Sequence, residues 1–263
     1  MPSWLIFTLP NPLLTDLFMK LLRFSFLLLS FPLFFLASCS KDDGPAPVDT
    51  DDAAYFPLRK GHFVEYHVDS TYWDDFTGIE TPRSLDLRYV VSDTLTDNEG
   101  RLSYTITVSR RKDATELWQP ESIFTVTRTS ERLEWIQNNL RFVKLVFPVQ
   151  AKREWNGNEF ISTLDPGKLF YGGWKYTYAD VGATAKNDFK TFENTLTVNQ
   201  VDETTNNPEQ QPNSYASRTY GQEKYAKNVG LIEKRFIHWT YDPGVAPYRK
   251  GVSVVMRAFN HNN

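Results

Sequence analysis

The chain lacks several residue patterns on which common protein chemistry depends. It has 263 residues and a single cysteine, Cys39, so it cannot form a disulfide within itself. None of its four histidines stands at the His-x-x-x-His spacing with which a helix holds zinc. No phosphate-binding loop, dinucleotide fingerprint or Gly-x-Ser-x-Gly elbow is present. We therefore expect no metal, no cofactor and no catalytic residues of these types.

A surplus of positive charge is also missing. The chain has 29 Lys and Arg residues against 32 Asp and Glu residues, a net charge of −3. Binding to nucleic acid needs a concentrated basic surface, so nucleic acid is not an expected partner. Binding of the folded part to an anionic membrane is unlikely to arise from this charge balance for the same reason. Residues 1–38 hold Lys20, Arg23 and Asp16, so the remainder is slightly more acidic still.

The beginning of the chain has the features of a secretory signal. Lys20 and Arg23 precede an apolar stretch, residues 24–36, which ends at the small residues Ala37-Ser38. A basic start, a short apolar run and small residues before the cut are what a signal peptide needs. An uncleaved membrane helix is the alternative, but Pro32 and the two basic residues interrupt the window of about 20 apolar residues that it requires.

The tetrapeptide Leu36-Ala37-Ser38-Cys39 resembles the lipobox of bacterial lipoproteins. That resemblance implies cleavage before Cys39, diacylglycerol on its thiol and a further acyl chain on the new amine. Two or more acyl chains hold a protein at a bilayer almost permanently, at about 0.8 kcal/mol per buried CH₂. We therefore expect a lipid anchor at Cys39 that holds the protein at a membrane.

The next four residues, Ser40-Lys41-Asp42-Asp43, resemble the surface-export signal of lipoproteins from the Bacteroidota. That resemblance implies exposure on the outer face of the outer membrane. One alternative is a solvated acidic spacer, which charge runs usually are. The other is a lipoprotein that faces the periplasm.

The predicted organisation has three parts. Residues 1–38 form the signal peptide, within which residues 1–18 precede a better start at Met19-Lys20 and indicate a start codon assigned too early. Residues 39–54 are rich in Asp and Pro and poor in apolar side chains, which is typical of a flexible tether. Residues 55–260 form a single β-rich domain, of a size that all-β folds often reach.

Within that domain, apolar residues alternate with polar ones. Residues 85–91 and 102–108 alternate on either side of Asp97-Asn98-Glu99-Gly100, which is a strong hairpin signal. About ten such strands must hide an apolar face and their edges. The sequence therefore predicts an all-β, mainly antiparallel fold, a curved sheet that forms a half-open barrel or a sandwich.

Local signals refine this pattern at a few places. Asn138-Asn139 and Asn156-Gly157 predict two tight turns. Residues 200–213 are polar and contain two prolines, which predicts an exposed loop. Residues 214–224 are the segment that favours a short helix.

Two patches resemble a family of uncharacterised lipoproteins from the Bacteroidota. The first is Phe56-Pro57-Leu58 with Gly61, Tyr66 and Val68-Asp69-Ser70, and the second is Tyr225-Ala226-Lys227-Asn228-Val229-Gly230-Leu231-Ile232. The family usually has Gly where this chain has Asn228, and Asn tolerates left-handed backbone angles well. The resemblance implies a sheet rolled into a half-open barrel, similar to bacterial lipoprotein-carrier folds, and implies no activity.

The aromatic content, 15%, is the compositional feature that indicates binding. Aromatic side chains on one face of a strand usually build a sheet core. Trp73, Trp118 and Trp155 differ because they lie in predicted loops beside polar residues. Exposed aromatic groups can mark an interaction surface, so these three residues are the predicted binding site.

Three functions remain open from the sequence. The first is a non-enzymatic binding or accessory module at the cell surface, for a glycan or an outer-membrane partner. The second is a lipid or lipoprotein carrier, which requires an apolar cavity of roughly several hundred Å³. The third is a glycoside hydrolase, which requires two carboxyl groups about 5–10 Å apart. Glu65, Asp69, Asp74 and Asp75 are the candidate acids for that reaction.

Overall fold

In the computed structural model, the chain is described over residues 50–244 and 248–262. The signal peptide, Cys39 and the export run 40–43 lie outside these residues. No helix among the described residues has the length and hydropathy needed to cross a bilayer. The elements are α2 (Thr50–Ala53), β1 (Phe63–Trp73), β2 (Glu80–Thr96), β3 (Leu102–Arg111), β4 (Gln119–Arg128), β5 (Arg132–Gln137), β6 (Leu140–Val146), β7 (Glu154–Trp155), the 3₁₀-helix η2 (Pro166–Tyr171), β8 (Tyr176–Lys186), β9 (Thr191–Thr205), β10 (Ala216–Ala226), β11 (Gly230–Asp242) and β12 (Tyr248–His261).

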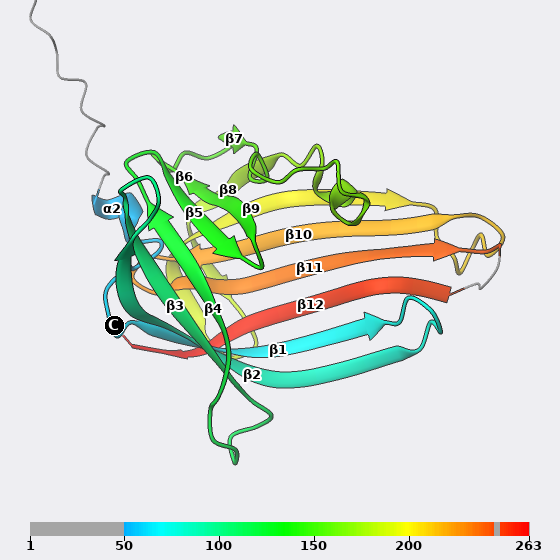
Figure 1. The fold of residues 1–263 in the computed structure, drawn as a ribbon, viewed down its shortest axis with the longest axis horizontal. Helices are drawn as coiled ribbons and strands as arrows, with labels where there is room; N and C mark the ends of the chain where they lie inside the picture. The colour runs from blue at the N-terminus through cyan, green and yellow to red at the C-terminus, as the bar shows by residue number, and fades with distance from the viewer. Residues whose placement is uncertain (1–49, 245–247, 263) are drawn as a thin grey trace, which may run out of the picture. The chain divides into compact units, whose positions relative to one another are not determined.

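All of these strands belong to one antiparallel sheet, in the order β6-β5-β4-β3-β2-β1-β12-β11-β10-β9-β8-β7. Strand β1 pairs with β12, from Val64 and His261 to Trp73 and Gly251, so the first and last strands lie side by side. Figure 1 shows β1, β2 and β10–β12 running alongside one another while β3 and β4 cross them steeply. The all-β antiparallel prediction is confirmed, and the sheet is nearly closed into a barrel.

The two edges of the sheet, β6 and β7, are consecutive in the chain, and we call the gap between them the seam. Individual hydrogen bonds bridge it. Val143 N donates to Gly157 O at 2.8 Å, and Trp155 Nε1 donates to Val143 O at 2.8 Å. Tyr178 OH lies 2.8 Å from Val146 N and 2.9 Å from Val146 O, so one hydroxyl serves both groups. These bonds cover an edge strand that would otherwise be free to pair with another chain.

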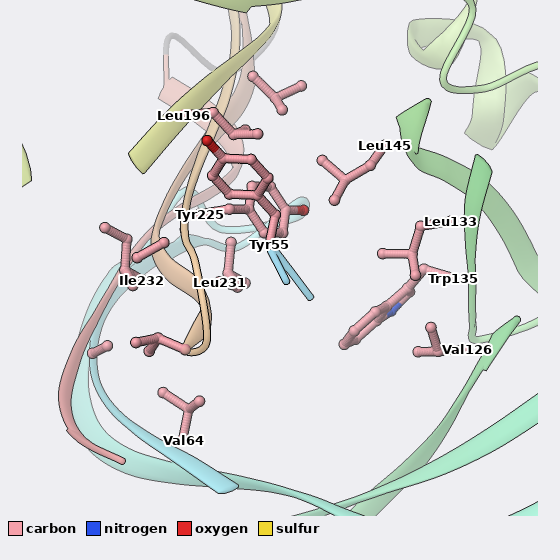
Figure 2. Close-up of a cluster of buried hydrophobic side chains, with 14 of the residues drawn as sticks. Tyr55, Val64, Val126, Leu133, Trp135, Leu145, Leu196, Tyr225, Leu231 and Ile232 are labelled. Carbon is pink, nitrogen blue, oxygen red and sulfur yellow. The ribbon is translucent and has the colours of Figure 1, made fainter. Parts of the chain in front are cut away.

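The core lies between the two walls of the barrel. Figure 2 shows Leu133, Trp135 and Leu145 from β5 and β6 on one side and Leu196 and Tyr225 from β9 and β10 on the other. Further buried rings come from β1, β4 and β8: Tyr66, Phe124, Tyr176 and Tyr178. Cavities of about 30 and 20 Å³ remain among the core side chains. They are far smaller than the roughly several hundred Å³ that a lipid carrier needs.

Three predicted turns are confirmed. Residues 97–101 join β2 to β3. Asn138 and Asn139 join β5 to β6 with φ of 51° and 61°, and positive φ at both central residues is what a type I′ turn requires. Asn228 has a φ of 63° just before β11, as its place in the closing patch predicts.

Three local predictions are wrong, one of them in part: residues 200–205 of the predicted exposed loop belong to β9, and Gln200 is buried. Residues 214–224 do not form a helix, because residues 216–226 form β10 and pair with β9 and β11 on its two sides. Asn156-Gly157 is not a primed turn, because neither residue has a positive φ. Gly157 is instead placed where a Cβ would lie 2.3 Å from the Tyr176 ring, so the backbone approaches closely there.

The described end of the predicted tether contacts the barrel. Helix α2 covers residues 50–53, and Asp52 Oδ2 accepts a hydrogen bond from Val149 N at 2.7 Å. Ala54 O accepts from Asn228 N at 2.7 Å. Tyr55 follows and is buried in the core. This segment therefore connects the end of β6 with the turn before β11.

Candidate functional site: a polar pocket at the seam

Two β-bulges bring polar side chains into the barrel. The pairing of β6 with β5 skips Lys144, and the pairing of β9 with β10 skips Gln200. A bulge sets two residues against one and breaks the alternation of the strand. Gln200 is 4% exposed, and the facing Gly221 makes room for it, since a Cβ there would lie 2.8 Å from Gln200 Oε1.

Both bulge residues line a cavity of about 130 Å³ at the seam, which we call the seam pocket. Its aromatic lining consists of Phe142, Tyr171, Trp174, Tyr176 and Phe236. Exposed Asn138 lies at its rim, whereas Tyr176 and Gln200 lie at its buried end. A cavity of about 150 Å³ accommodates a benzene ring. The seam pocket therefore has room for about one ring and is open to solvent.

One wall of the pocket comes from the connection between β7 and β8. Phe170 of η2 stacks on His238 of β11, with ring centroids 4.0 Å apart and an interplanar angle of 17°. Trp174 Nε1 donates to Phe170 O at 2.6 Å, and Asn158 Nδ2 donates to Tyr171 O at 2.9 Å. Burial lowers the pKa of His238, which favours the neutral ring in this stack. The wall is thus held in place from several sides.

A buried carboxylate lies beside the inner end of the pocket. Lys144 Nζ donates to Glu223 Oε1 at 2.7 Å, and Tyr225 OH donates to Glu223 Oε2 at 2.6 Å. Burial raises the pKa of Glu223, but the nearby Lys144 and Lys234 ammonium groups outweigh it, and the net shift is downward. Glu223 is therefore ionised, and each of its oxygens already has a donor.

Lys234 on β11 is the second basic group of the pocket. It stands across the strand pair from Glu223, yet no described residue places an oxygen within ion-pair or hydrogen-bonding distance of Lys234 Nζ. Gln200 Nε2 is also buried without an acceptor. Burial lowers the pKa of Lys234 to about 8, with a further contribution from Lys144 and an opposing one from Glu223. The site therefore has one more cation than anions, and it has two unmatched donors.

Two wider hollows also lie on the described part of the chain. One of about 920 Å³ contains Lys227, which pairs with Asp51. Another of about 380 Å³ contains Asp69, which pairs with Arg257 at 3.1 Å. The smaller seam pocket is the better candidate because its donors are unmatched.

Two of the predicted binding tryptophans lie at strand ends, Trp73 within β1 and Trp118 just before β4. Trp73 is the last residue of β1, and its Nε1 donates to Glu80 Oε2 at 3.2 Å. Trp118 precedes β4, with the Arg111 guanidinium 4.4 Å from its ring centroid. Both are half-buried. Trp73 pairs with Glu80 of β2, and Arg111, which contacts Trp118, pairs with Asp86 of β2. Residues 80 and 86 are about 20 Å apart along a strand, so the two tryptophans do not form one surface.

The third predicted tryptophan, Trp155, belongs to the seam. It lies in β7 rather than in a loop, and its ring centroid is 4.5 Å from that of Tyr178. Its Nε1 bonds to Val143 O across the gap. Trp155 is half-buried and packs against the core, so the structure gives it a contact role in closing the barrel.

A second polar cluster lies on β1 and β2 and contains Asp86, His67 and Ser84. His67 Nδ1 lies 3.1 Å from Asp86 Oδ1, and His67 Nε2 lies 3.1 Å from Ser84 Oγ, an order that matches a hydrolase triad. However, Ser84 Oγ donates its single proton to Asp69 Oδ1 at 3.0 Å. The hydroxyl proton that His67 Nε2 would have to accept is therefore already held by Asp69. The cluster links two strands and does not prepare a nucleophile.

The candidate acids of the hydrolase alternative have other contacts. Glu65 Oε2 accepts from Asn260 Nδ2 at 3.0 Å. Asp74 Oδ1 accepts from the backbone N–H groups of Thr77 and Phe76, and these bonds, with that of the Thr77 hydroxyl, lower the pKa of Asp74. Asp74 is therefore a turn-capping residue.

The sequence analysis did not identify the residues of the seam pocket. One signal was available for Lys234, because it stands two residues before Phe236 on the inward face of a predicted strand. No comparable signal marks Lys144 or Gln200, because the bulges that turn them inward come from pairing with distant strands.

Comparison with known proteins gives two similar structures. No protein-family model matches the chain, and no curated protein matches it. A protein from Bacteroides fragilis described as exported, with a YmcC-like fold, has 11% identity and a TM-score of 0.36 over 79% of this chain and 98% of its own. A protein from Parabacteroides distasonis described as a lipoprotein has 12% identity and a TM-score of 0.31 over the same shares. At these TM-scores neither structure supports a functional conclusion.

Proposed function

We propose that the protein is a lipid-anchored envelope protein that binds a small ligand in the seam pocket without catalysing a reaction on it. One observation carries the binding role. The pocket of about 130 Å³ has an aromatic lining, an exposed rim at Asn138 and unmatched polar donors at its buried end. The anchor is supported by the likeness of residues 36–39 to a lipobox.

The unmatched donors favour a ligand over a purely structural role. A buried donor without an acceptor costs about 1–3 kcal/mol, and Gln200 Nε2 is such a donor. A ligand oxygen would remove that cost. Because η2 and Trp174 are already fixed by hydrogen bonds, little ordering is needed on binding, which favours affinity.

The ligand class that fits this lining is a polar ring, of which the terminal residue of a glycan is an example. Aromatic side chains cover the faces of such a ring, and a few polar groups fix its orientation. The amides of Gln137, Asn138 and Gln200 are available at different depths of the pocket. Export through residues 40–43 would expose the rim to ligands outside the cell.

Blocking the pocket tests the binding role. Lipidated full-length protein in detergent is incubated with the small-molecule fraction of an envelope extract, and retained compounds are identified by mass spectrometry. Leu140→Trp fills the pocket from its lining, and we expect at least a tenfold loss of the retained compounds. Gln137→Trp is a second such variant, in case the first does not fold.

Leu102→Trp is the matched control. Leu102 also begins a strand just after a tight turn but is 56% exposed, so it should retain the same compounds as the wild type. If the wild type retains nothing, or if both blocked variants fold and retain as much as the control, the binding role is wrong.

Metabolic labelling tests the anchor separately. Radioactive palmitate should label the wild type and leave Cys39→Ala unlabelled. Protease added to intact cells should then cleave the labelled protein if it is exposed at the surface. A mature chain that begins upstream of Cys39 and has no acyl mass would contradict the anchor.

A further inference from the structure

The unmatched donors of the seam pocket indicate the charge of its ligand. We propose that the pocket binds a ring-bearing carboxylate, whose oxygens are held by Lys234 Nζ and Gln200 Nε2. This inference rests on the proposed binding function and adds the chemical class of the ligand.

The charges around Lys234 leave a place for one anion. Glu223 is the carboxylate on the neighbouring strand, and its two oxygens are occupied by Lys144 and Tyr225. The remaining titratable groups that line the pocket or the adjoining inner cavity are phenols, and burial raises the pKa of each, so they stay neutral: Tyr89 on β2, Tyr171 on η2, Tyr176 on β8 and Tyr225 on β10. Within the part of the chain that the structure describes, nothing balances the second ammonium group.

A carboxylate matches this arrangement in charge and in shape. It has one negative charge and two oxygens, and the pocket offers one unpaired ammonium and one unpaired amide N–H. A phosphate group carries more negative charge than the single unpaired ammonium group in the lining can balance. An ion pair with hydrogen-bonded oxygens is also the form in which a buried ammonium is stable.

The lining supplies the second half of the ligand. Phe142 and Tyr171 lie with ring centroids 5.7 Å apart, and Trp174 and Phe236 with centroids 6.5 Å apart. These rings offer faces and edges to an apolar or sugar ring. With a volume of about 130 Å³, one ring and its carboxylate fill the pocket, so a longer ligand must continue outward past Asn138.

Paired probes test the charge requirement directly. Binding of benzoate against benzamide, and of glucuronate against glucose, is measured by calorimetry on the lipidated full-length protein in detergent at pH 7. We expect the acid to bind at least tenfold more tightly than its neutral analogue in at least one pair. The pair that shows the preference distinguishes an aromatic acid from a sugar acid.

Variants test whether Lys234 causes the preference for the acid over its neutral analogue. Lys234→Met should bind the acid no better than the neutral analogue, whereas Lys175→Met should keep the wild-type preference. Lys175 follows Trp174 but its side chain is 79% exposed and points away from the cavity lining. Gln200→Leu removes the second donor without changing charge and should reduce acid affinity while leaving some preference.

The pH dependence gives a second readout. The affinity for the acid should fall by up to tenfold per pH unit as Lys234 loses its proton, and the affinity of Lys234→Met should not change over the same range. A preference for the acid that survives in Lys234→Met, or no preference in either pair, overturns the inference. Neutral probes that bind the wild type as tightly as the acids do, and that do not bind Leu140→Trp, would overturn it while the proposed binding function stands.

Discussion

Two buried charge clusters of this protein differ in how completely they are paired. The Glu134 carboxylate on β5 is 0% exposed and lies 2.7 Å from Arg132, 3.1 Å from Arg101 and 3.7 Å from Arg141. Each of these arginines also contacts a further acid, from the set Asp97, Glu99 and Glu159. Cations and anions are therefore interleaved throughout this cluster.

The cluster beside the seam pocket is not completed in this way. Lys144 and Lys234 have one carboxylate between them, Glu223, and it forms an ion pair with Lys144 alone. A fully paired cluster ties strands together and serves the fold, whereas an unpaired buried charge costs stability. The difference separates a structural network from the site for which we propose a ligand.

The largest effect is expected at the fully paired cluster. Glu134→Ala leaves three arginines without their shared partner and should lower the free energy of unfolding by about 3–5 kcal/mol. Urea denaturation measures the loss. The control is Glu121→Ala, which removes an exposed pair with Arg110 and should cost less than about 1 kcal/mol. Equal losses at the two sites would mean that the Glu134 network adds nothing.

The tryptophans give a second contrast between the seam and the outer strands. Trp155→Ala removes a ring that packs on Tyr178 and a bond to Val143, and it should cost about 2–4 kcal/mol. Trp73→Ala and Trp118→Ala should each cost about 1 kcal/mol or less. Thermal denaturation ranks the three. A large loss for all of them would exclude a binding role for Trp73 and Trp118 that is separate from the core.

Unlike the substitutions above, Lys234→Met should raise the stability of the folded protein. The substitution replaces an unpaired buried ammonium with an apolar side chain of similar length, and it should raise the free energy of unfolding by about 1–3 kcal/mol at pH 7. Lys175→Met should leave it within about 0.5 kcal/mol. Destabilisation by Lys234→Met would show that Lys234 already has a partner in the folded protein.

The smallest effect is the pH dependence of the stability that Lys234→Met adds. The folded chain releases the Lys234 proton near pH 8, because burial lowers its pKa to about 8. The unfolded chain keeps the proton to about 10.4, so it binds more protons in this window and wild-type stability rises with pH. The advantage of Lys234→Met should therefore shrink between pH 7 and pH 10. A gap that stays constant in urea denaturation over this range would contradict the assigned pKa.

The strands could be predicted from the sequence because period-two alternation survives wherever pairing is regular. Residues 85–91 and 102–108 lie in β2 and β3 as expected. The helix prediction for residues 214–224 was wrong because their polar and charged side chains do not indicate a strand. The strand there is specified by pairing with its neighbours β9 and β11. Strand identity there depends on tertiary pairing more than on local composition.

The candidate site could not be predicted because it depends on exceptions to alternation. At each of two bulges, adjacent side chains face inward: Lys144 with Leu145, and Gln200 with Val201. A bulge is set by the register between two strands, which no single segment encodes. The predicted site residues Trp73, Trp118 and Trp155 were chosen for their polar neighbours in sequence, and that criterion does not report burial or packing.

The pairing of β1 with β12 has a consequence for how the domain is made. The first strand to be synthesised cannot complete its hydrogen bonds until the last one has been translated, and contacts so distant in sequence form slowly. A chain terminated before Tyr248 would leave β1 and β11 with bare edges that can join other chains. The incomplete chain must therefore be kept from associating until its final residues arrive.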